Sequence, residues 1–260
     1  MYFGRERLPR IQFARNPLKV VIAQMRFPAE LALAEPAAHT RIQAGLRARY
    51  PLAQPLDQMS IQVALGPQAM PPVSQSRSSG IRFASESGDW AVTVSPDAVS
   101  LQATAYHDWD DFKGRFEQVL DVLLAEARVR RVDRLGLRFI DELSHPEVRT
   151  LADWSQLLDA SLLGTAATDR FAGIATRTTE QIVLEEGDDG AVITHAYFQN
   201  PPDSDPPSTF VLDTDGFSAR PFDLDREEIR VRLERYHDAA WNLFRETVRE
   251  PMIEWLGVEA

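Results

Sequence analysis

Three polar side chains that could take part in a binding site lie in the segment 134–143 (RLGLRFIDEL). Its apolar residues recur at every second position, which predicts a strand with one buried face. Arg134 and Arg138 fall on the opposite face, where a guanidinium could bind a carboxylate or a phosphate. Asp141 falls on the apolar face, so burial would raise its pKa unless a partner stabilises the charge. All three are candidate binding residues, although the arrangement of the two arginines suits a solvated polar face better than a ligand site.

Two aromatic residues and one histidine complete the candidate binding set. Tyr106 and Trp109 could form an aromatic recognition patch, but their spacing with Phe112 also fits packing on one face of a helix. His237 lies in the last predicted helix and could supply a further polar group. We expect these residues to hold a partner or a ligand rather than to perform a reaction.

The motifs of common catalytic and metal sites are missing from the sequence. It contains no cysteine, no G-x-S-x-G, no P-loop and no G-x-G-x-x-G fingerprint. Its five histidines show no spacing typical of a metal site, such as H-x-x-x-H. The sequence therefore predicts no catalytic residue, no metal site and no cofactor. Without cysteine, disulfides and thiolate ligands are excluded.

A helix and a strand within the segment 105–143 would position most of these candidates. Asp108 is predicted to cap the helix, because its carboxylate can accept hydrogen bonds from free backbone amides of the first turn. Apolar residues then recur at three- and four-residue steps as far as Ala127, which gives the helix one apolar face. The strand at 134–143 follows, and we expect the apolar face of the helix to cover it.

The same periodicities predict the other elements. In the first half we expect a strand at 18–27, a helix at 36–49, a linker at 51–57, a strand at 60–65, a loop at 66–80 and strands at 81–85, 90–95 and 98–104. In the second half we expect a helix at 151–163, strands at 171–185, 191–199 and 209–213, and a last helix capped by Asp225. The segment 66–80 is rich in Pro, Ser, Gln and Gly and is predicted to be mobile.

Both halves thus share one predicted order: a strand, a helix, three or four antiparallel strands and a helix. We predict an α+β fold in which residues 1–131 and residues 132–260 arose by duplication and share one continuous curved sheet with the helices on one face. The saddle of the TATA-binding protein and the helix-grip folds are related arrangements. Such an open sheet leaves edges, through which a homodimer could form.

The charge distribution makes nucleic acid an improbable partner. The formal net charge is −11, with net +6 in residues 1–50 (nine basic, three acidic) and net −13 in residues 151–260 (nine basic, 22 acidic). Duplex binding generally needs a concentrated basic face. The sequence has no run of about 18 apolar residues, so no membrane span is predicted. The N-terminal residues lack the apolar region of a signal peptide, and we expect a cytoplasmic protein.

Several segments together resemble a sporadically distributed family of uncharacterised bacterial proteins. The matching features are Asn16-Pro17 before the strand at 18–27, the Tyr-x-x-Trp-x-x-Phe element at Tyr106, Trp109 and Phe112, the Gly-Leu-Arg-Phe-Ile-Asp strand at 136–141, and His237 and Phe244 in the last helix. The resemblance covers most of the chain. Phe139 stands where Tyr is frequent and Asp141 where Asn is frequent; a carboxylate there removes the hydrogen-bond donor of an amide.

The resemblance implies a bacterial accessory protein but no particular reaction, and its patchy distribution suits mobile or defence-associated genes. Our first hypothesis is a non-catalytic protein that holds a protein partner on the open face of the sheet or on the loop at 66–80, in a defence, immunity or antitoxin role. The alternative is a small-molecule binder or enzyme with a pocket between the sheet and the long helices, using Arg138, Asp141 or His237. Nucleic-acid binding ranks last.

Overall fold

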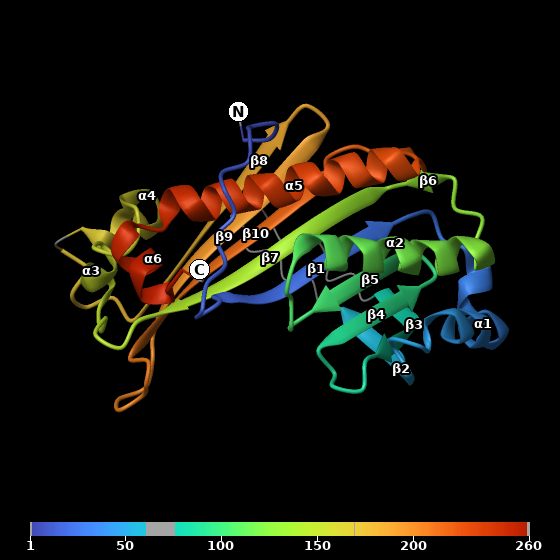
Figure 1. Ribbon diagram of the computed structural model, residues 1–260, viewed down its shortest axis with the longest axis horizontal. Coiled ribbons are helices and arrows are strands. Elements are labelled where there is room, and N and C mark those ends of the chain that lie inside the picture. The colour runs from blue at the N-terminus through green and yellow to red at the C-terminus, as the bar shows by residue number, and fades with distance from the viewer. Residues whose placement is uncertain (1, 61–75, 169, 259–260) are drawn as a thin grey trace. The chain divides into compact units, whose positions relative to one another are not determined.

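The computed structural model describes residues 2–60, 76–168 and 170–258 (Figure 1). It is an α+β protein with antiparallel sheet, as predicted, and it divides into two compact units. Unit 1 comprises Met1–Ile22, Arg134–Pro221 and Asp225–Ala260, and unit 2 comprises Ala23–Asp133 and Phe222–Leu224. The division near residue 133 lies close to the one expected at 131, whereas the first 22 residues group with the second half of the chain.

The described part of unit 2 contains four whole sheet strands, part of a fifth, two α-helices, one 3₁₀ helix and a short two-stranded pair. Its elements are the second half of β1 (Leu18–Arg26), the 3₁₀ helix η1 (Leu31–Ala34), α1 (Pro36–Leu46), β2 (Leu52–Ser60), β3 (Ser76–Ala84), β4 (Trp90–Ser95), β5 (Ala98–Ala103), α2 (Trp109–Glu126), β6 (Arg131–Val132) and β11 (Phe222–Asp223). Strands β2, β3, β4 and β5 are antiparallel neighbours in this order, and β6 pairs with β11.

Helix α2 forms where the sequence predicts it. The Asp108 carboxylate accepts a hydrogen bond from the Asp111 amide at 2.8 Å and so caps the first turn. The predicted apolar face is buried from Trp109 to Leu123, and it packs against α1 and β5. The helix therefore stabilises unit 2 through burial of one face, as its periodicity implies.

Strands β2 and β3 are longer than their sequences suggest. The linker expected at 51–57 is wrong, because residues 52–57 belong to β2, which contains Pro55. Of the strand expected at 60–65 only Ser60 is described, as the end of β2, and 61–65 lie outside the described residues. A proline is tolerated because β2 is the last strand in the order, where a missing N–H need not cost a ladder hydrogen bond. The loop expected at 66–80 falls mostly on 61–75, outside the described residues, and its end at 76–80 belongs to β3.

Unit 1 contains the long strands and the longest helix. Its elements are the first half of β1, β7 (Arg134–Ser144), α3 (Leu151–Trp154), α4 (Ala160–Leu163), the 3₁₀ helix η2 (Gly164–Ala167), β8 (Arg177–Glu186), β9 (Asp189–Gln199), β10 (Ser208–Ser218), α5 (Arg226–Thr247) and α6 (Glu250–Leu256). The order β7, β10, β9, β8 is antiparallel throughout.

One predicted helix of unit 1 is broken. The single helix expected at 151–163 is two short helices, because Thr150 and Asp153 form a capping box around α3 and Asp159 caps a new start at α4. The strand expected from 171 begins only at Arg177, and β10 continues to Ser218, beyond the expected end at 213. The predicted cap of the last helix is confirmed: the Asp225 carboxylate accepts from the amides of two first-turn residues of α5.

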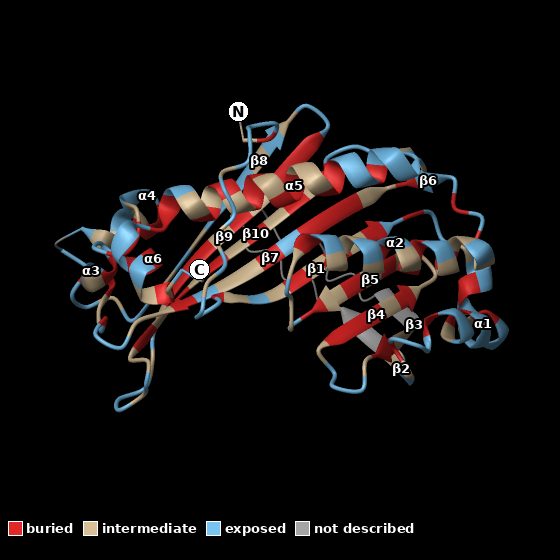
Figure 2. Ribbon diagram, viewed as in Figure 1, coloured by how far each residue is buried: buried red, intermediate tan, exposed pale blue. Residues whose placement is uncertain are grey.

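The two faces of the unit 1 sheet differ in burial. In β10 every second residue from Ser208 to Ser218 is buried and the residues between are half-buried, a pattern that Figure 2 shows as alternating colours. Helix α5 packs on the buried face, over β10 and β7 (Figure 1). At Gly216 the approach is so close that a Cβ atom would lie 2.9 Å from the Tyr236 Cβ. This covered face carries the core of unit 1, and the other face lacks a helix of this unit among the described elements.

Among the described residues, no helix is both long and apolar enough to span a membrane.

Candidate functional site

Charged and polar side chains line the open face of the unit 1 sheet. We define this open face by the side chains that point away from α5: Arg134, Arg138 and Glu142 of β7, Asp213, Asp215 and Phe217 of β10, Thr194 and Phe198 of β9, and Arg177, Thr179, Gln181, Val183 and Glu185 of β8. The strand registers place them in rows across the four strands. All of them are exposed or half-exposed.

Arg138 is held by Asp213 on the neighbouring strand. Its Nε donates to Asp213 Oδ1 at 2.7 Å, and its Nη2 donates to the other carboxylate oxygen, so the pair is bidentate. The hydrogen bond to Asp213 raises the pKa of the guanidinium. The Arg138 side chain is nevertheless 44% exposed. Its orientation is fixed by the pair while one side of the group stays accessible to a partner.

The Arg134 side chain extends along β7 and reaches Asp215 on the neighbouring strand β10. Its Nη2 donates to Asp215 Oδ2 at 2.6 Å, and its guanidinium carbon lies 4.9 Å from the centre of the Phe217 ring. Gly136 makes this path possible, because a Cβ at that position would lie 2.5 Å from the Arg134 Nη1. Burial raises the pKa of Asp215, and the adjacent Arg134 charge opposes the rise.

A second arginine–aromatic contact occurs at the edge of the open face. Arg177 lies over the Phe198 ring, with its guanidinium carbon 5.0 Å from the ring centre. Between these contacts the Gln181 amide donates to the Thr194 hydroxyl at 3.1 Å. The open face therefore combines three arginines and two aromatic rings with four carboxylates, those of Glu142, Asp213, Asp215 and Glu185. Its charge is close to balanced.

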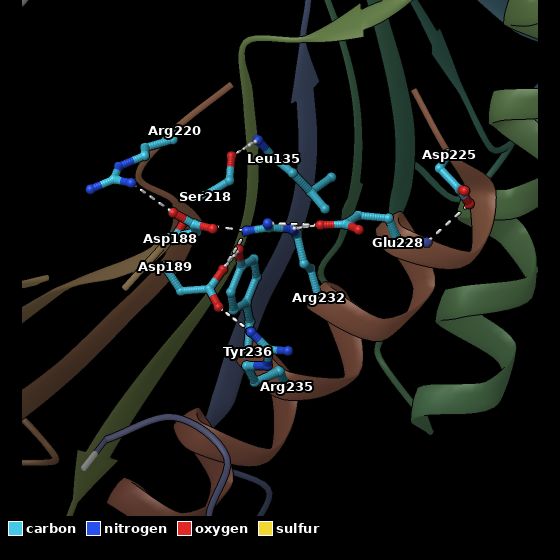
Figure 3. Close-up of polar contacts among 10 residues, drawn as sticks. All are labelled: Leu135, Asp188, Asp189, Ser218, Arg220, Asp225, Glu228, Arg232, Arg235 and Tyr236. Carbon is cyan, nitrogen blue, oxygen red and sulfur yellow. Dashed lines mark hydrogen bonds and ion pairs between the residues drawn. The ribbon is translucent and has the colours of Figure 1, made fainter. Parts of the chain in front are cut away.

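The covered face holds a second group of arginines and acids, drawn in Figure 3. Asp189, at the start of β9, is buried with 2% of its surface exposed. Its carboxylate accepts hydrogen bonds from Arg232 Nη1 and the Tyr236 hydroxyl, both at 2.6 Å, and from Arg235. Arg232 also donates to Glu228 at 2.8 Å. We call Asp189, Arg232, Arg235 and Tyr236 the Asp189 cluster.

The Asp189 cluster fixes α5 to the turn between β8 and β9. A buried carboxylate is stable only when its charge is compensated and its oxygens are hydrogen-bonded. Burial, together with the hydrogen bond that it donates to Asp189, raises the pKa of Tyr236, so the phenol remains a donor. In the sequence Asp188 and Asp189 stand between two glycines, which is typical of a turn and gives no sign of this role. The three α5 partners lie three and four residues apart, and that spacing is the one signal that could have indicated a shared target.

Asp141 lies on the covered face, as its position in the strand predicts. It is opposite Leu212 in the register and half-buried. Burial raises the pKa of its carboxyl to about 7, with a smaller contribution from the Asp213 charge. The described residues give it no hydrogen-bond or ion-pair partner. Arg138 points to the opposite face, so these two predicted site residues do not meet in unit 1.

His237 also lies on the covered face, in α5. Its ring contacts Phe139 edge-on at 5.9 Å between centres, and its Nδ1 lies 3.0 Å from Asp238 Oδ1. Burial lowers its pKa. Glu234, His237 and Asp238 offer ligand atoms within 4.8 Å of one another, a grouping that could hold a cation. Arg7 already pairs with Asp238 at 3.4 Å, so a protein cation occupies this acidic group.

The aromatic candidates belong to unit 2. Trp109 is 1% exposed, and its ring stacks on Phe112 with the centres 6.0 Å apart. Tyr106 contacts the same Phe112 ring at 6.1 Å. Phe112 also packs against Trp90 at 5.9 Å. Trp109 is therefore part of the core of unit 2, and the alternative of helix packing describes it better than a recognition patch.

The structure thus brings Arg134 and Arg138 together on one face and places Asp141 and His237 on the other. The partners Asp213 and Asp215 are not evident from the sequence, because they lie 75 and 81 residues away from Arg138 and Arg134 and depend on a strand pairing. Comparison with protein-family models and with curated proteins found no match for this chain.

Proposed function

We propose that this chain is a non-catalytic binding protein of the bacterial cytoplasm that holds a protein partner against the open face of unit 1. The observation that carries the proposal is the placement of Arg134, Arg138 and Arg177 beside aromatic rings and acids on an accessible sheet. Arginine and aromatic residues are enriched in protein–protein interfaces and dominate their binding energy. A defence, immunity or antitoxin accessory is the role that the resemblance of the sequence suggests.

The charge of the open face favours a protein over a nucleic acid. Three arginines stand against four carboxylates, so the face lacks the excess of positive charge that neutralises phosphates. Each β7 arginine is already oriented by an aspartate of β10. Such preorganised pairs favour a partner that presents both charge signs in a complementary pattern, and side chains fixed before binding lose less entropy on association.

A small-molecule binder or enzyme is the second candidate, and Asp141 is the observation that favours it. A carboxyl with a pKa of about 7 could exchange a proton near neutral pH. Asp141 and His237 would be the polar groups of such a site, on the covered face of unit 1. Arg138 cannot join them, because its side chain lies on the open face.

The duplication and the saddle-like or helix-grip arrangement are part of the same proposal. In support, unit 2 follows the order strand, helix, four strands, helix, from β1 to α2. Unit 1 follows the order strand, short helices, three strands, helix, from β7 to α5. One ancestral binding element, copied once, would give both units and leave each copy free to change its surface.

The proposal is tested by native mass spectrometry of the tagged protein recovered from its own host. We compare the wild type with Arg138→Asp, the exchange Arg138→Asp/Asp213→Arg, and Arg47→Asp, which alters an exposed arginine of unit 2. A polypeptide that co-purifies at fixed stoichiometry, is lost in Arg138→Asp and is kept in Arg47→Asp supports the open face. Partial recovery in the exchange variant strengthens the assignment.

Other outcomes separate the two candidates. A polypeptide that stays bound to the Arg138→Asp variant overturns the open face as the binding surface. A small retained mass that disappears in Asp141→Asn supports the second candidate instead.

A further inference from the structure

Strand β8 ends the unit 1 sheet and offers a free edge. It pairs with β9 over ten consecutive residue positions, from Arg177 to Glu186, without a bulge. On its other side no strand pairs with it among the described residues. Ile182 and Val183, in the middle of the strand, are 45% and 60% exposed.

The turn between β8 and β9 determines which backbone groups face outward. It has two residues and begins with Gly187 at φ 69°, as a tight hairpin turn of type II′ requires. Such a turn closes on a hydrogen-bonded pair, here Glu186 and Asp189, and hydrogen-bonded pairs then alternate along the hairpin. The N–H and C=O groups of the odd-numbered residues, from Arg177 to Glu185, therefore point away from β9.

This edge lacks several of the features that prevent strands from pairing. Natural edge strands are protected by proline, by charged side chains (lysine above all), by bulges or by short length. Strand β8 (RTTEQIVLEE) has neither proline nor lysine and is long and regular. The other terminal strand, β2, contains Pro55. Of the two terminal strands, β8 is therefore the better able to pair with a further strand, and its open-face charges, Arg177 and Glu185, have opposite signs.

We propose that a second copy of this chain pairs antiparallel with β8, with Gln181 opposite Gln181 of the second copy. In this register Arg177 lies opposite Glu185 of the second copy, twice by symmetry, and Thr179 lies opposite Val183. The odd-numbered residues form five hydrogen-bonded pairs, which together exchange about ten hydrogen bonds. The strand is thus complementary in charge to its own antiparallel copy.

Neighbouring registers fit less well. A register shift must keep open-face side chains beside open-face side chains, so the sum of the paired residue numbers must stay even. Lowering that sum by two places Glu180 opposite Glu180, and like charges directly opposite are destabilising. Raising it by two moves Arg177 opposite Gly187 and removes both ion pairs. The register centred on Gln181 combines opposite charges and contains no like-charge pair.

Cross-linking tests the register directly, because the natural chain has no cysteine. Paired residues at Gln181 would have Cα atoms about 5.5 Å apart, within the range of a disulfide. Mild oxidation of Gln181→Cys should give a covalent dimer, whereas Thr179→Cys should not, since Thr179 faces Val183 of the second copy. Equal cross-linking of both variants, or of neither, would overturn the register.

Charge exchange and proline substitution test the dimer itself in the full-length chain. Sedimentation or native mass spectrometry should show a dimer of the 29.3 kDa chain. Arg177→Glu should weaken self-association about tenfold, since it replaces two opposite-charge pairs by like charges, and Arg177→Glu/Glu185→Arg should restore it. Val183→Pro removes an outward N–H and should yield a monomer with native circular dichroism. A wild type that stays monomeric up to its solubility limit, or a dimer indifferent to all three variants, would overturn the proposal.

Discussion

Unit 1 contains two groups of arginines and aspartates that use the same chemistry in opposite surroundings. In the Asp189 cluster on the covered face, the Asp189 and Arg232 side chains are 3% and 9% exposed. On the open face, the Arg138 and Asp213 side chains are 44% and 16% exposed. Both groups join elements that are far apart in the sequence, and their hydrogen-bond distances are similar, 2.6 Å for Arg232 to Asp189 and 2.7 Å for Arg138 to Asp213. Solvent access distinguishes the two groups.

Burial decides what each group contributes. Removal of one partner from a buried ion pair leaves an uncompensated charge and typically costs about 3–5 kcal/mol. An exposed pair is typically worth about 0–1 kcal/mol, because water competes for both groups. We therefore expect the Asp189 cluster to contribute substantially to stability, while the open-face pairs contribute too little stability to explain their arrangement. That difference supports the open face as the surface for a partner.

The largest expected effect is at Asp189. Asp189→Ala removes the buried carboxylate that accepts hydrogen bonds from Arg232, Arg235 and Tyr236, and should lower the free energy of unfolding by about 3–5 kcal/mol. Urea denaturation followed by circular dichroism measures this change. Asp188→Ala is the matched control, because Asp188 is 57% exposed and pairs with the exposed Arg220. If Asp189→Ala is as stable as that control, the cluster does not hold α5, and the contrast between the faces disappears.

Two glycines sharpen the comparison, because alanine at either position would place a Cβ atom close to a neighbouring side chain. At Gly216 the obstacle is the Cβ of Tyr236 on α5, and at Gly136 it is the end of the Arg134 side chain. Gly216→Ala should cost about 1–3 kcal/mol, because helix and sheet must separate. Gly136→Ala should change stability by less than about 0.5 kcal/mol, because a flexible side chain can move and alanine favours the strand more than glycine does. Equal effects in thermal unfolding would contradict this difference.

Asp141 is an acid of the covered face to which the described residues give no arginine partner. Its folded-state pKa of about 7 lies above the ordinary value for aspartate. The folded protein thus binds the proton more tightly than the unfolded chain, so stability is full at low pH and falls as the pH rises from about 4 to about 7.

The side chain of the Asp141→Asn variant cannot ionise, so this variant should be more stable than the wild type at high pH. We expect a gain of about 2 kcal/mol at about pH 8, which should vanish near pH 4. The gain is smaller than the full shift implies, because the carboxyl is half-exposed and solvent screens its charge. Urea denaturation over this pH range, with Glu142→Gln as the exposed control, measures it. A difference that does not vary with pH would mean that Asp141 is not buried enough to perturb its titration.

Local sequence patterns predict much of the covered face, but they predict little of the contacts between residues far apart in the sequence. The alternation of Leu135, Leu137 and Leu143 indicates the buried face of β7, and the caps at Asp108 and Asp225 follow from side chains that bond the next few amides. These features depend on residues close together in the sequence. The pairing of Arg138 with Asp213 depends on a strand register that no short segment encodes.

The elements that the sequence did not predict also depend on interactions outside the local segment. Pro55 argues locally against a strand, but the end position of β2 tolerates it. The apolar residues at 151–163 suggest one helix, yet the caps at Thr150 and Asp159 divide it in two. The Asp189 cluster requires α5 to lie over the β8–β9 turn, a tertiary arrangement in which residues some 43 to 47 positions apart meet. Sequence spacing alone does not determine such contacts.

A small expected effect on folding, at Arg138, decides the comparison. Arg138→Ala and Asp213→Ala should each change the free energy of unfolding by less than about 1 kcal/mol, and a double-mutant cycle should give a coupling energy in the same range. Loss of a bound partner at unchanged stability would then assign the pair to binding, because unfolding could not account for it. A cost near that of Asp189→Ala would instead make the pair structural. The two faces would then differ only in exposure, and the low stability of the open-face pairs would no longer support the open face as the binding surface.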